Sequence, residues 1–178
     1  MVAAGRGAHW ALTALFRAYQ PMLLRYLRGR ESAVADDLAS EVWVAVARGL
    51  AGFDDDERGF RRWLFTIARR RVIEHRRKVV RRRTDPVAPE RLEGARAGDG
   101  GDPASVVVER LSGQEAVDLI VADLTPDQAE VVLLRVVGGF DVAEVARIMH
   151  RTPGSVRVLC HRALKRLAAR YPEGVLIE

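Results

Sequence analysis

Residues 124–167 contain two strong helix-start signals, and these divide the stretch into short helices. Thr125 and Thr152 each precede a proline, and a Thr–Pro pair is typical of an N-cap followed by the first helical residue. The glycine pair Gly138–Gly139 ends the helix that begins after Thr125. We therefore expect at least two helices here, separated by a sharp break in the chain.

A third helix is expected between the break and Thr152. Asp141 and Glu144 have the spacing of a capping box, although the box proper begins with Ser or Thr. Apolar residues recur at helical spacing along all three helices. The expected inner faces are Ala129, Val132, Leu133 and Val136, then Val142, Val145, Ala146 and Met149, then Val156, Cys160, Ala163 and Leu167. Three short helices with these faces can pack around one core.

The last of these helices is basic. Residues 151–170 contain six arginines and lysines and no acidic residue, whereas a helix face that is merely solvated usually mixes both signs. The layout is that of a helix-turn-helix, whose second helix enters the major groove of DNA. The candidate DNA-reading residues are Arg151, Thr152, Ser155, Arg157, Val158, His161, Arg162 and Lys165.

The amino-terminal half predicts three longer helices. The first covers about residues 9–28, with Pro21 kinking or restarting it and Gly29 ending it. The second covers about residues 32–50, and its outer face is acidic. The third starts near Phe60 and is expected to bury Trp63, Leu64, Ile67, Ala68, Val72 and His75.

The third helix concentrates positive charge. Residues 60–83 contain ten arginines and one lysine against a single glutamate, while the whole chain has a net charge of +5. Such a concentration indicates an anionic partner, of which nucleic acid is the usual one and a membrane surface the alternative. Three aromatic residues near these arginines, Phe53, Phe60 and Phe65, either stack on unpaired bases or belong to the core. Trp63 is expected in the core, because it lies on the same face as Ile67.

The chain is predicted to be all-α, with two small helical domains at residues 9–83 and 114–172. Residues 84–113 are rich in proline and glycine and are expected to form a flexible linker. The single cysteine, Cys160, argues for a reducing, cytoplasmic compartment, and no segment suggests a signal peptide or membrane insertion. Scattered histidines and the absence of catalytic signatures predict no metal, no cofactor and no enzymatic activity.

Two strings in the amino-terminal half resemble segments of bacterial sigma factors. The string ADDLASEVW at residues 35–43 resembles their "D-L-x-Q-E-V-F" segment, and FRRWLFTIAR at residues 60–69 resembles their promoter-melting helix. Residues 124–167 resemble the helix-turn-helix that reads the −35 element. Only these two regions are present, which is similar to the extracytoplasmic-function (group 4) sigma factors.

The resemblance implies partners and roles. One set of residues matches the segment that docks on the β′ clamp helices of RNA polymerase core: Asp36, Asp37, Leu38, Glu41, Val42 and Trp43. Another matches the part that captures a flipped base of the −10 element and holds the melted strand: Phe53, Phe60, Arg61, Arg62, Phe65, Arg69, Arg70, Arg76 and Arg77. The polymerase β flap and promoter DNA are implied as further partners, together with an anti-sigma factor that clamps both domains.

The chain departs from the family pattern at three places. Arg70 stands where Asn is common, Met149–His150 where Leu-Gly is common, and Val158–Leu159 where Ser and Arg are common. The last change predicts a different −35 sequence, with apolar contact to a thymine methyl. Two other functions stay open at this point: a free-standing helix-turn-helix regulator, and an RNA-binding or other basic adaptor.

Overall fold

The computed structural model describes residues 9–84, 117–118 and 121–170, and every secondary-structure element in these ranges is a helix. The elements follow one another as α2 (His9–Glu31), η1 (Ser32–Val34), α3 (Ala35–Gly49), η2 (Leu50–Gly52), α4 (Glu57–Thr84), α6 (Pro126–Val136), α7 (Val142–Met149) and α8 (Pro153–Arg170). None of the described helices is both long and apolar enough to cross a membrane. The predicted linker, residues 84–113, lies almost entirely outside the described residues.

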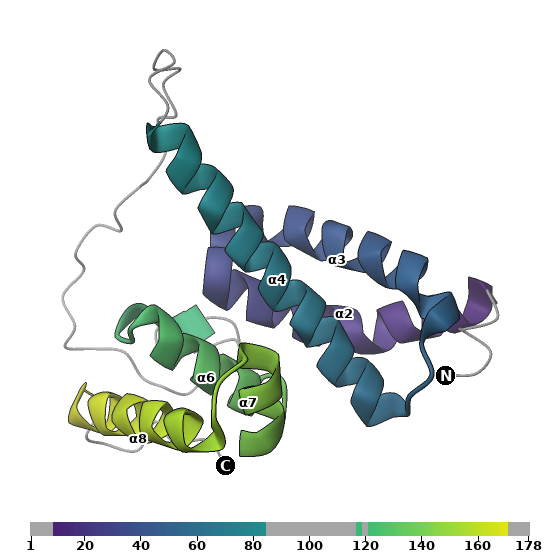
Figure 1. Ribbon diagram of the computed structural model, residues 1–178. Helices are drawn as coiled ribbons and strands as arrows, with labels where there is room; N and C mark the ends of the chain where they lie inside the picture. The colour runs from purple at the N-terminus through teal and green to yellow at the C-terminus, as the bar shows by residue number, and fades with distance from the viewer. Residues whose placement is uncertain (1–8, 85–116, 119–120, 171–178) are drawn as a thin grey trace, which may run out of the picture.

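Helices α2, α3 and α4 form the amino-terminal unit (Figure 1). Helix α3 buries one apolar face, and α2 contributes Leu23, Tyr26 and Leu27 to the same core. The helix α2 continues through Pro21 to Glu31, which excludes a restart at Pro21, and the predicted end at Gly29 was wrong. Packing of α2 against α3 and α4 stabilises the helix despite the hydrogen bond that a proline removes.

Helices α6, α7 and α8 form the carboxyl-terminal unit, and their starts follow the predicted caps. Thr125 accepts a hydrogen bond from the Gln128 amide, and Asp141 accepts one from the Glu144 amide, with a reciprocal side-chain bond in each capping box. The turn before α8 depends on His150, which ends α7 in the left-handed conformation with φ of 52°. Glycine adopts that conformation without strain, which gives a physical reason for the Gly that is common at this place in the resembling family.

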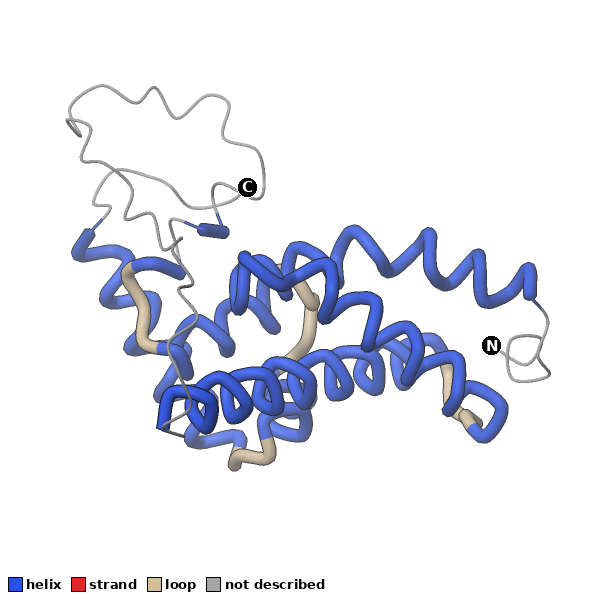
Figure 2. Tube along the Cα trace, turned by 90° about the horizontal axis from the view of Figure 1, so that it is seen from above, coloured by secondary structure: helices blue, strands red, loops and turns tan. Residues whose placement is uncertain are grey.

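The two units pack against each other and share one core. Helix α6 lies against α2, and α7 lies against α4 (Figure 1). Figure 2 shows the described residues from above, as helices joined by loops. The packing is close at Gly29 of α2, because a Cβ there would lie 2.9 Å from Val117 Cγ1 and 3.0 Å from Leu133 Cδ1, so a larger residue would require these side chains to shift. The sequence predicted two helical domains, and the structure places them in direct contact across this continuous core.

Individual burial predictions were mostly confirmed, with informative exceptions. Val136 was expected on the inner face of α6, but it lies in the last turn of that helix and is 53% exposed. Trp63, Ile67, His75 and Cys160 were expected to be buried and are only partly so. Trp63 lies at the edge of the core, where its ring stacks on Phe53.

Candidate nucleic-acid interface

The outer face of α8 presents the predicted DNA-reading residues to solvent. Arg157, Val158, His161, Arg162 and Lys165 are exposed, and Ser155 is half-buried beside them. Val156, Ala163 and Leu167 face inward, so the helix is anchored by the opposite side. In the described part of the chain no carboxylate forms an ion pair with Arg157, Arg162 or Lys165, and these cations are available to a phosphate or a base edge.

Two of the predicted −35 residues hold the start of α8. Thr152 Oγ1 accepts a hydrogen bond from the Ser155 amide at 3.2 Å, which is the geometry of an N-cap. Arg151 donates to Asp127 of α6 at 2.5 Å and so ties the turn to the preceding helix. Both side chains position α8, whatever further contact they make with DNA.

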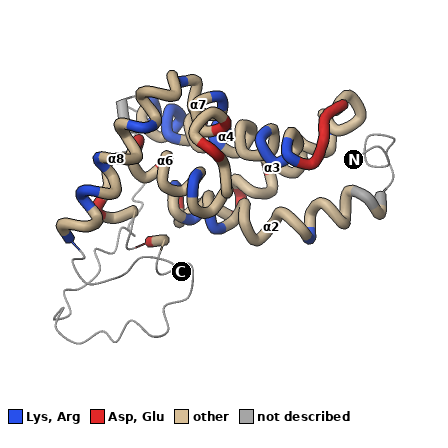
Figure 3. The backbone as a smooth tube through the Cα atoms, turned by 90° about the horizontal axis from the view of Figure 1, so that it is seen from below, with Lys and Arg blue, Asp and Glu red and all other residues tan. Residues whose placement is uncertain are grey.

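The arginines of α4 are engaged by carboxylates of the protein itself. Arg62 pairs with Asp55 at 3.0 Å, Arg70 with Glu74 at 2.8 Å, and Arg76 with Glu31 of α2. Arg70 and Arg71 hold the pKa of the Glu74 carboxyl below its usual value, chiefly through the hydrogen bond from Arg70. Part of the positive charge of the helix is therefore paired within the protein; Figure 3 marks the basic residues in blue and the acidic ones in red.

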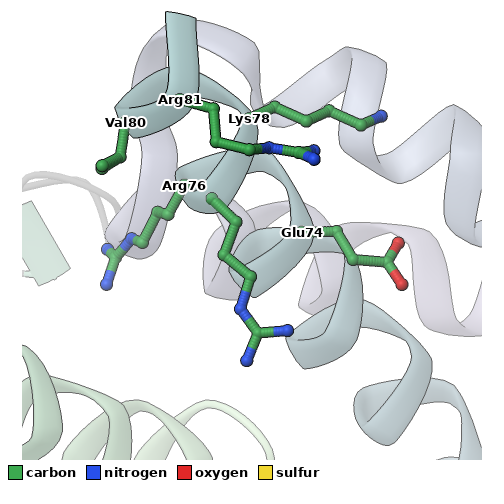
Figure 4. A pocket seen from close by; sticks show the side chains of 6 residues that line it. Glu74, Arg76, Lys78, Val80 and Arg81 are labelled. Atoms are coloured by element: carbon green, nitrogen blue, oxygen red, sulfur yellow. The ribbon is translucent and has the colours of Figure 1, made fainter. Parts of the chain in front are cut away.

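Beyond Glu74 the helix becomes uniformly basic. A surface pocket along this part of α4 is lined by Glu74, Arg76, Arg77, Lys78, Val80 and Arg81, and Figure 4 shows the long basic side chains around it. Arg77 and Lys78 are exposed. This half of α4 suits a run of phosphates more than a single compact ligand, because the cations extend along one helix.

One buried carboxylate of the carboxyl-terminal unit, that of Glu130, contacts three polar side chains of the amino-terminal unit. Glu130 of α6 is only 3% exposed. Its carboxylate accepts hydrogen bonds from Arg69 Nε at 3.0 Å and from Tyr26 Oη at 3.3 Å, and Arg30 lies 3.7 Å away. Burial and the adjacent Glu130 charge raise the pKa of Tyr26 well above its usual value. Arg69, which was predicted to hold the melted strand, is thus paired with Glu130 in this conformation.

A second contact between the units involves Arg58, which the sequence did not single out. Arg58 donates to Glu144 Oε1 and to Asp141 Oδ2, each at 2.6 Å. Glu144 is buried, and the hydrogen bond from Arg58 is the main cause that lowers the pKa of its carboxyl. The pKa of Asp141 is also lowered, mainly by the Glu144 amide that it caps. The two capping-box residues of α7, Asp141 and Glu144, therefore also bind α4 through Arg58.

Aromatic packing completes the contact between α4 and the turn before α7. The rings of Phe65 and Phe140 meet edge to face at 5.2 Å, and the Arg61 guanidinium lies over the Phe140 ring at the same distance. Phe60 and Phe65 are fully buried, and Phe53 is half-buried against Phe60 and Trp63. The predicted stacking of Phe60 and Phe65 on bases does not fit this conformation, because both rings are part of the core.

Helix α3 presents an acidic face away from the core. Asp36, Asp37 and Glu41 are exposed, and Val44 on the same side is 50% exposed. The other three predicted polymerase-contacting residues, Leu38, Val42 and Trp43, are buried in the core, which corrects the expectation that they contact a partner directly. Val44 was missed, although it lies two turns after Asp37 and shares its face.

No group of three or more His, Cys, Asp or Glu side chains in the described ranges could hold a metal ion. The site is thus made of cations, hydrogen-bond donors and aromatic rings on helices, which are the groups that contact phosphates and base edges.

Comparison with known proteins matches both halves of the chain. Residues 15–83 match the family model described as Sigma-70 region 2, and residues 114–167 match Sigma-70, region 4. In solved structures, the sigma factor RpoE from Bartonella quintana, in complex with the anti-sigma factor NepR, superposes with a TM-score of 0.67 at 22% identity, covering 90% of this chain and 96% of that one. CnrH in complex with the cytosolic domain of CnrY gives a TM-score of 0.65 at 20% identity, covering 96% and 94%.

Curated relatives are similar over most of the chain. The ECF RNA polymerase sigma factor SigD of Mycobacterium tuberculosis is 34% identical over 163 residues, covering 88% of this chain and 75% of SigD. ShbA of Streptomyces griseus is 33% identical over 157 residues, covering 84% and 81%. BldN of Streptomyces coelicolor is 34% identical over 165 residues, covering 92% of this chain, which spans 61% of BldN. The chain belongs to the sigma-70 family, in its extracytoplasmic-function (ECF) group of RNA polymerase sigma factors.

Proposed function

We propose that this chain binds RNA polymerase core through α3, reads a −35 element through α8, and contacts a −10 element through α4. The observation that supports this division most is that one acidic surface and two basic surfaces lie on three separate helices of one chain. The acidic face of α3 suits a protein partner, while the cations of α4 and α8 suit DNA. A free-standing helix-turn-helix regulator has no use for the α3 face, and the family matches favour the sigma factor.

The α3 surface is defined by Asp37, Glu41 and Val44, which lie on one side of the helix and are exposed. We expect the two carboxylates to meet basic residues of the polymerase and Val44 to add apolar contact beside them. Trp43 supports this surface from beneath, because its indole donates to Gln20 at 2.6 Å and its ring packs on Phe16. Its role is to fix the orientation of α3.

On the DNA side, we assign base contacts to the amino-terminal half of α8 and phosphate contacts to its later turns. Arg157, Val158 and Arg162 lie where the second helix of a helix-turn-helix reaches base edges. Val158 is 48% exposed and can contact a thymine methyl, whereas the arginines can bind guanine through two hydrogen bonds. Along α4 we assign Arg77 and Lys78 to phosphates of the −10 region.

We also propose an anti-sigma partner, which the neighbours in the structural comparison suggest by being solved in complex with NepR and with CnrY. Such a partner would compete with polymerase for the α3 surface. A pull-down from resting cells is the direct check. A stoichiometric small protein that core polymerase displaces supports sequestration, and recovery of only the free chain and polymerase complexes contradicts it.

The experiment that tests the proposal is binding of the purified chain to RNA polymerase core. We expect Asp37→Lys and Glu41→Lys to weaken core binding strongly, and the double variant to abolish it, without loss of helicity by circular dichroism. Glu74→Lys makes the same change of charge on α4 and should leave core affinity unchanged. Equal affinity for core of the wild type and the double α3 variant would contradict the assignment of this face.

A further inference from the structure

We propose that Arg70, held in place by Glu74, selects guanine at one position of the −10 region. This inference rests on the proposed role of α4 in −10 binding and deepens it, because it names the base that one side chain of this helix reads. Arg70 determines the specificity, and Glu74 is a positioning residue that acts through it. The two side chains lie one helical turn apart on α4.

The carboxylate of Glu74 holds two arginines at once. Glu74 is the single acidic residue in the basic stretch 60–83. Its Oε1 accepts a hydrogen bond from Arg70 Nε at 2.8 Å, and its Oε2 accepts one from Arg71 Nη1 at 2.9 Å. Arg71 in turn lies 3.8 Å from Glu41 of α3. One oxygen of Glu74 is therefore fixed by Arg71, and the other fixes Arg70.

The hydrogen bond to Glu74 uses only one edge of the Arg70 guanidinium. Its Nε is engaged, while Nη1 and Nη2 form no hydrogen bond or ion pair with another side chain in the described part of the chain. The side chain is 80% exposed, so this end of the guanidinium is open to a ligand. An arginine that is already held loses less side-chain freedom on binding than a free one. Arg70 thus presents two adjacent N–H donors in a set direction.

Two adjacent donors match one base best. Guanine presents two acceptors side by side, O6 and N7, whereas adenine places a donor beside its N7, thymine offers O4 alone, and cytosine offers a donor. A lysine ammonium does not reproduce this pairing, because it is a point charge without a planar fork. Guanine is therefore the base that the geometry of Arg70 favours.

The charge of Glu74 argues against a phosphate at the same place. The carboxylate lies 2.8 Å from Arg70 Nε and repels an anion that approaches the guanidinium, whereas the acceptors of guanine carry no net charge. One turn beyond Glu74, Lys78 extends from the same side of α4 (Figure 4). In the described residues, neither Lys78 nor Arg77 is paired with a carboxylate. Helix α4 thus places a base-reading arginine before a stretch that suits phosphates.

The test compares the promoter sequences that the holoenzyme selects. Core polymerase is loaded with the full chain or a variant and incubated with DNA in which both promoter elements are randomised, and the bound and transcribed DNA is sequenced. We expect the wild type to prefer guanine roughly tenfold at one −10 position, as one bidentate contact allows. Arg70→Lys keeps the charge and should abolish this preference. Replacing that guanine by 7-deazaguanine, which lacks the N7 acceptor, should weaken binding of the wild type and leave that of Arg70→Lys unchanged.

Glu74→Ala tests the positioning role. Without the carboxylate Arg70 is free to rotate, so the guanine preference should fall severalfold, while the loss of a negative charge should raise the affinity for DNA of every sequence. Glu74→Gln keeps an oxygen for Arg70 Nε and should restore much of the preference. Arg77→Ala is the control on the same helix, because loss of a phosphate contact should weaken binding of all sequences alike and leave the base preference unchanged.

Several results would overturn the inference and leave the proposed function standing. These are a guanine preference that Arg70→Lys leaves intact, a loss of affinity in Arg70→Lys that is equal for all sequences, and a Glu74→Ala profile identical to that of the wild type. A wild-type holoenzyme that selects −10 sequences without a guanine position has the same consequence. A wild-type holoenzyme that shows no −10 preference at all contradicts the proposed function, and the inference with it.

Discussion

The two basic helices of this protein, α4 and α8, look alike in sequence and differ in structure. Both carry clusters of arginine, but four arginines of α4 pair with Glu31, Asp55, Glu74 and Glu130, while Arg157 and Arg162 of α8 face solvent without an ion pair in the described residues. A run of positive charge therefore does not by itself define a free anion-binding face. Whether the arginines can bind an anion depends on which carboxylates the fold places beside them.

The difference follows from the position of each helix. Helix α4 is central, since it contacts α2, α3 and α7, and each neighbour supplies acidic or aromatic side chains. Among the described helices, α8 packs on α6 and α7 through its inner face. The predicted DNA-reading face of α8 is therefore exposed in this conformation, whereas Arg58 and Arg69 of α4 are paired with Glu144 and Glu130 of the carboxyl-terminal unit.

The largest effect on stability is expected at the contact between the two units. Phe140→Ala removes a fully buried ring shared by both units and should lower the free energy of unfolding by about 3–5 kcal/mol. All three tryptophans lie in the amino-terminal half, so their fluorescence in urea reports whether a change in the carboxyl-terminal unit is felt there. Val136→Ala, at an exposed position nearby in sequence, is the control. An unchanged tryptophan transition in Phe140→Ala would show that the units are not coupled.

The next effect concerns the exposed helix. Arg157→Ala or Arg162→Ala should weaken promoter binding of the polymerase complex by about 1–3 kcal/mol if the arginine binds a base through two hydrogen bonds. Footprinting over the −35 region of a cognate promoter measures this. Arg170→Ala, near the end of the same helix and paired with Asp123, should have a smaller effect. Undiminished −35 protection in both α8 variants would refute the assignment.

A smaller effect is expected at the turn that orients α8. His150 has a positive φ, and a non-glycine residue in that region is strained by about 1 kcal/mol. His150→Gly should therefore raise the free energy of unfolding by up to about 1 kcal/mol and leave −35 binding intact. Urea denaturation measures it. A destabilised His150→Gly protein would mean that the imidazole makes a contact worth more than the strain.

The smallest effect is a pH dependence of the contact between the units. The pKa values of the Glu144 and Asp141 carboxyls are lowered in the folded protein, so their contacts with Arg58 stabilise it above the ordinary pKa values of these groups. This stabilisation is lost as the pH falls through the lowered values. The difference in unfolding free energy between wild type and Arg58→Ala should shrink toward acid pH. A constant difference would contradict the ion-pair account.

Local signals in the sequence predicted the helix starts and most buried positions. The caps at Thr125, Asp141 and Thr152 act within three residues, so they are readable without tertiary information. The same holds for the exposed face of α8, which follows from helical periodicity. The burial predicted for Val136 was wrong, because periodicity does not show that the last turn of α6 lies outside the core.

The pairing of the arginines could not be predicted, since its partners are far apart along the chain. Arg69 and Glu130 are separated by 61 positions, and Arg58 and Glu144 by 86. No local pattern marks such a pair. The burial of Phe60 and Phe65 could not be predicted either. An aromatic residue next to arginines is compatible with a core position and with a base-stacking surface, and only the packing distinguishes the two. Arg58 had no local signal at all.

The most direct test of the contrast between α4 and α8 is chemical modification of arginine side chains in the free protein, with each site resolved by mass spectrometry. Phenylglyoxal should modify Arg157 and Arg162 readily, while Arg69, whose side chain is 18% exposed and paired with Glu130, should be protected. Substitution of Glu130 and Glu144 by Gln should then raise the reactivity of Arg69 and leave that of Arg157 unchanged. Modification of Arg69 in the wild-type chain at the same rate as Arg157 would contradict the account.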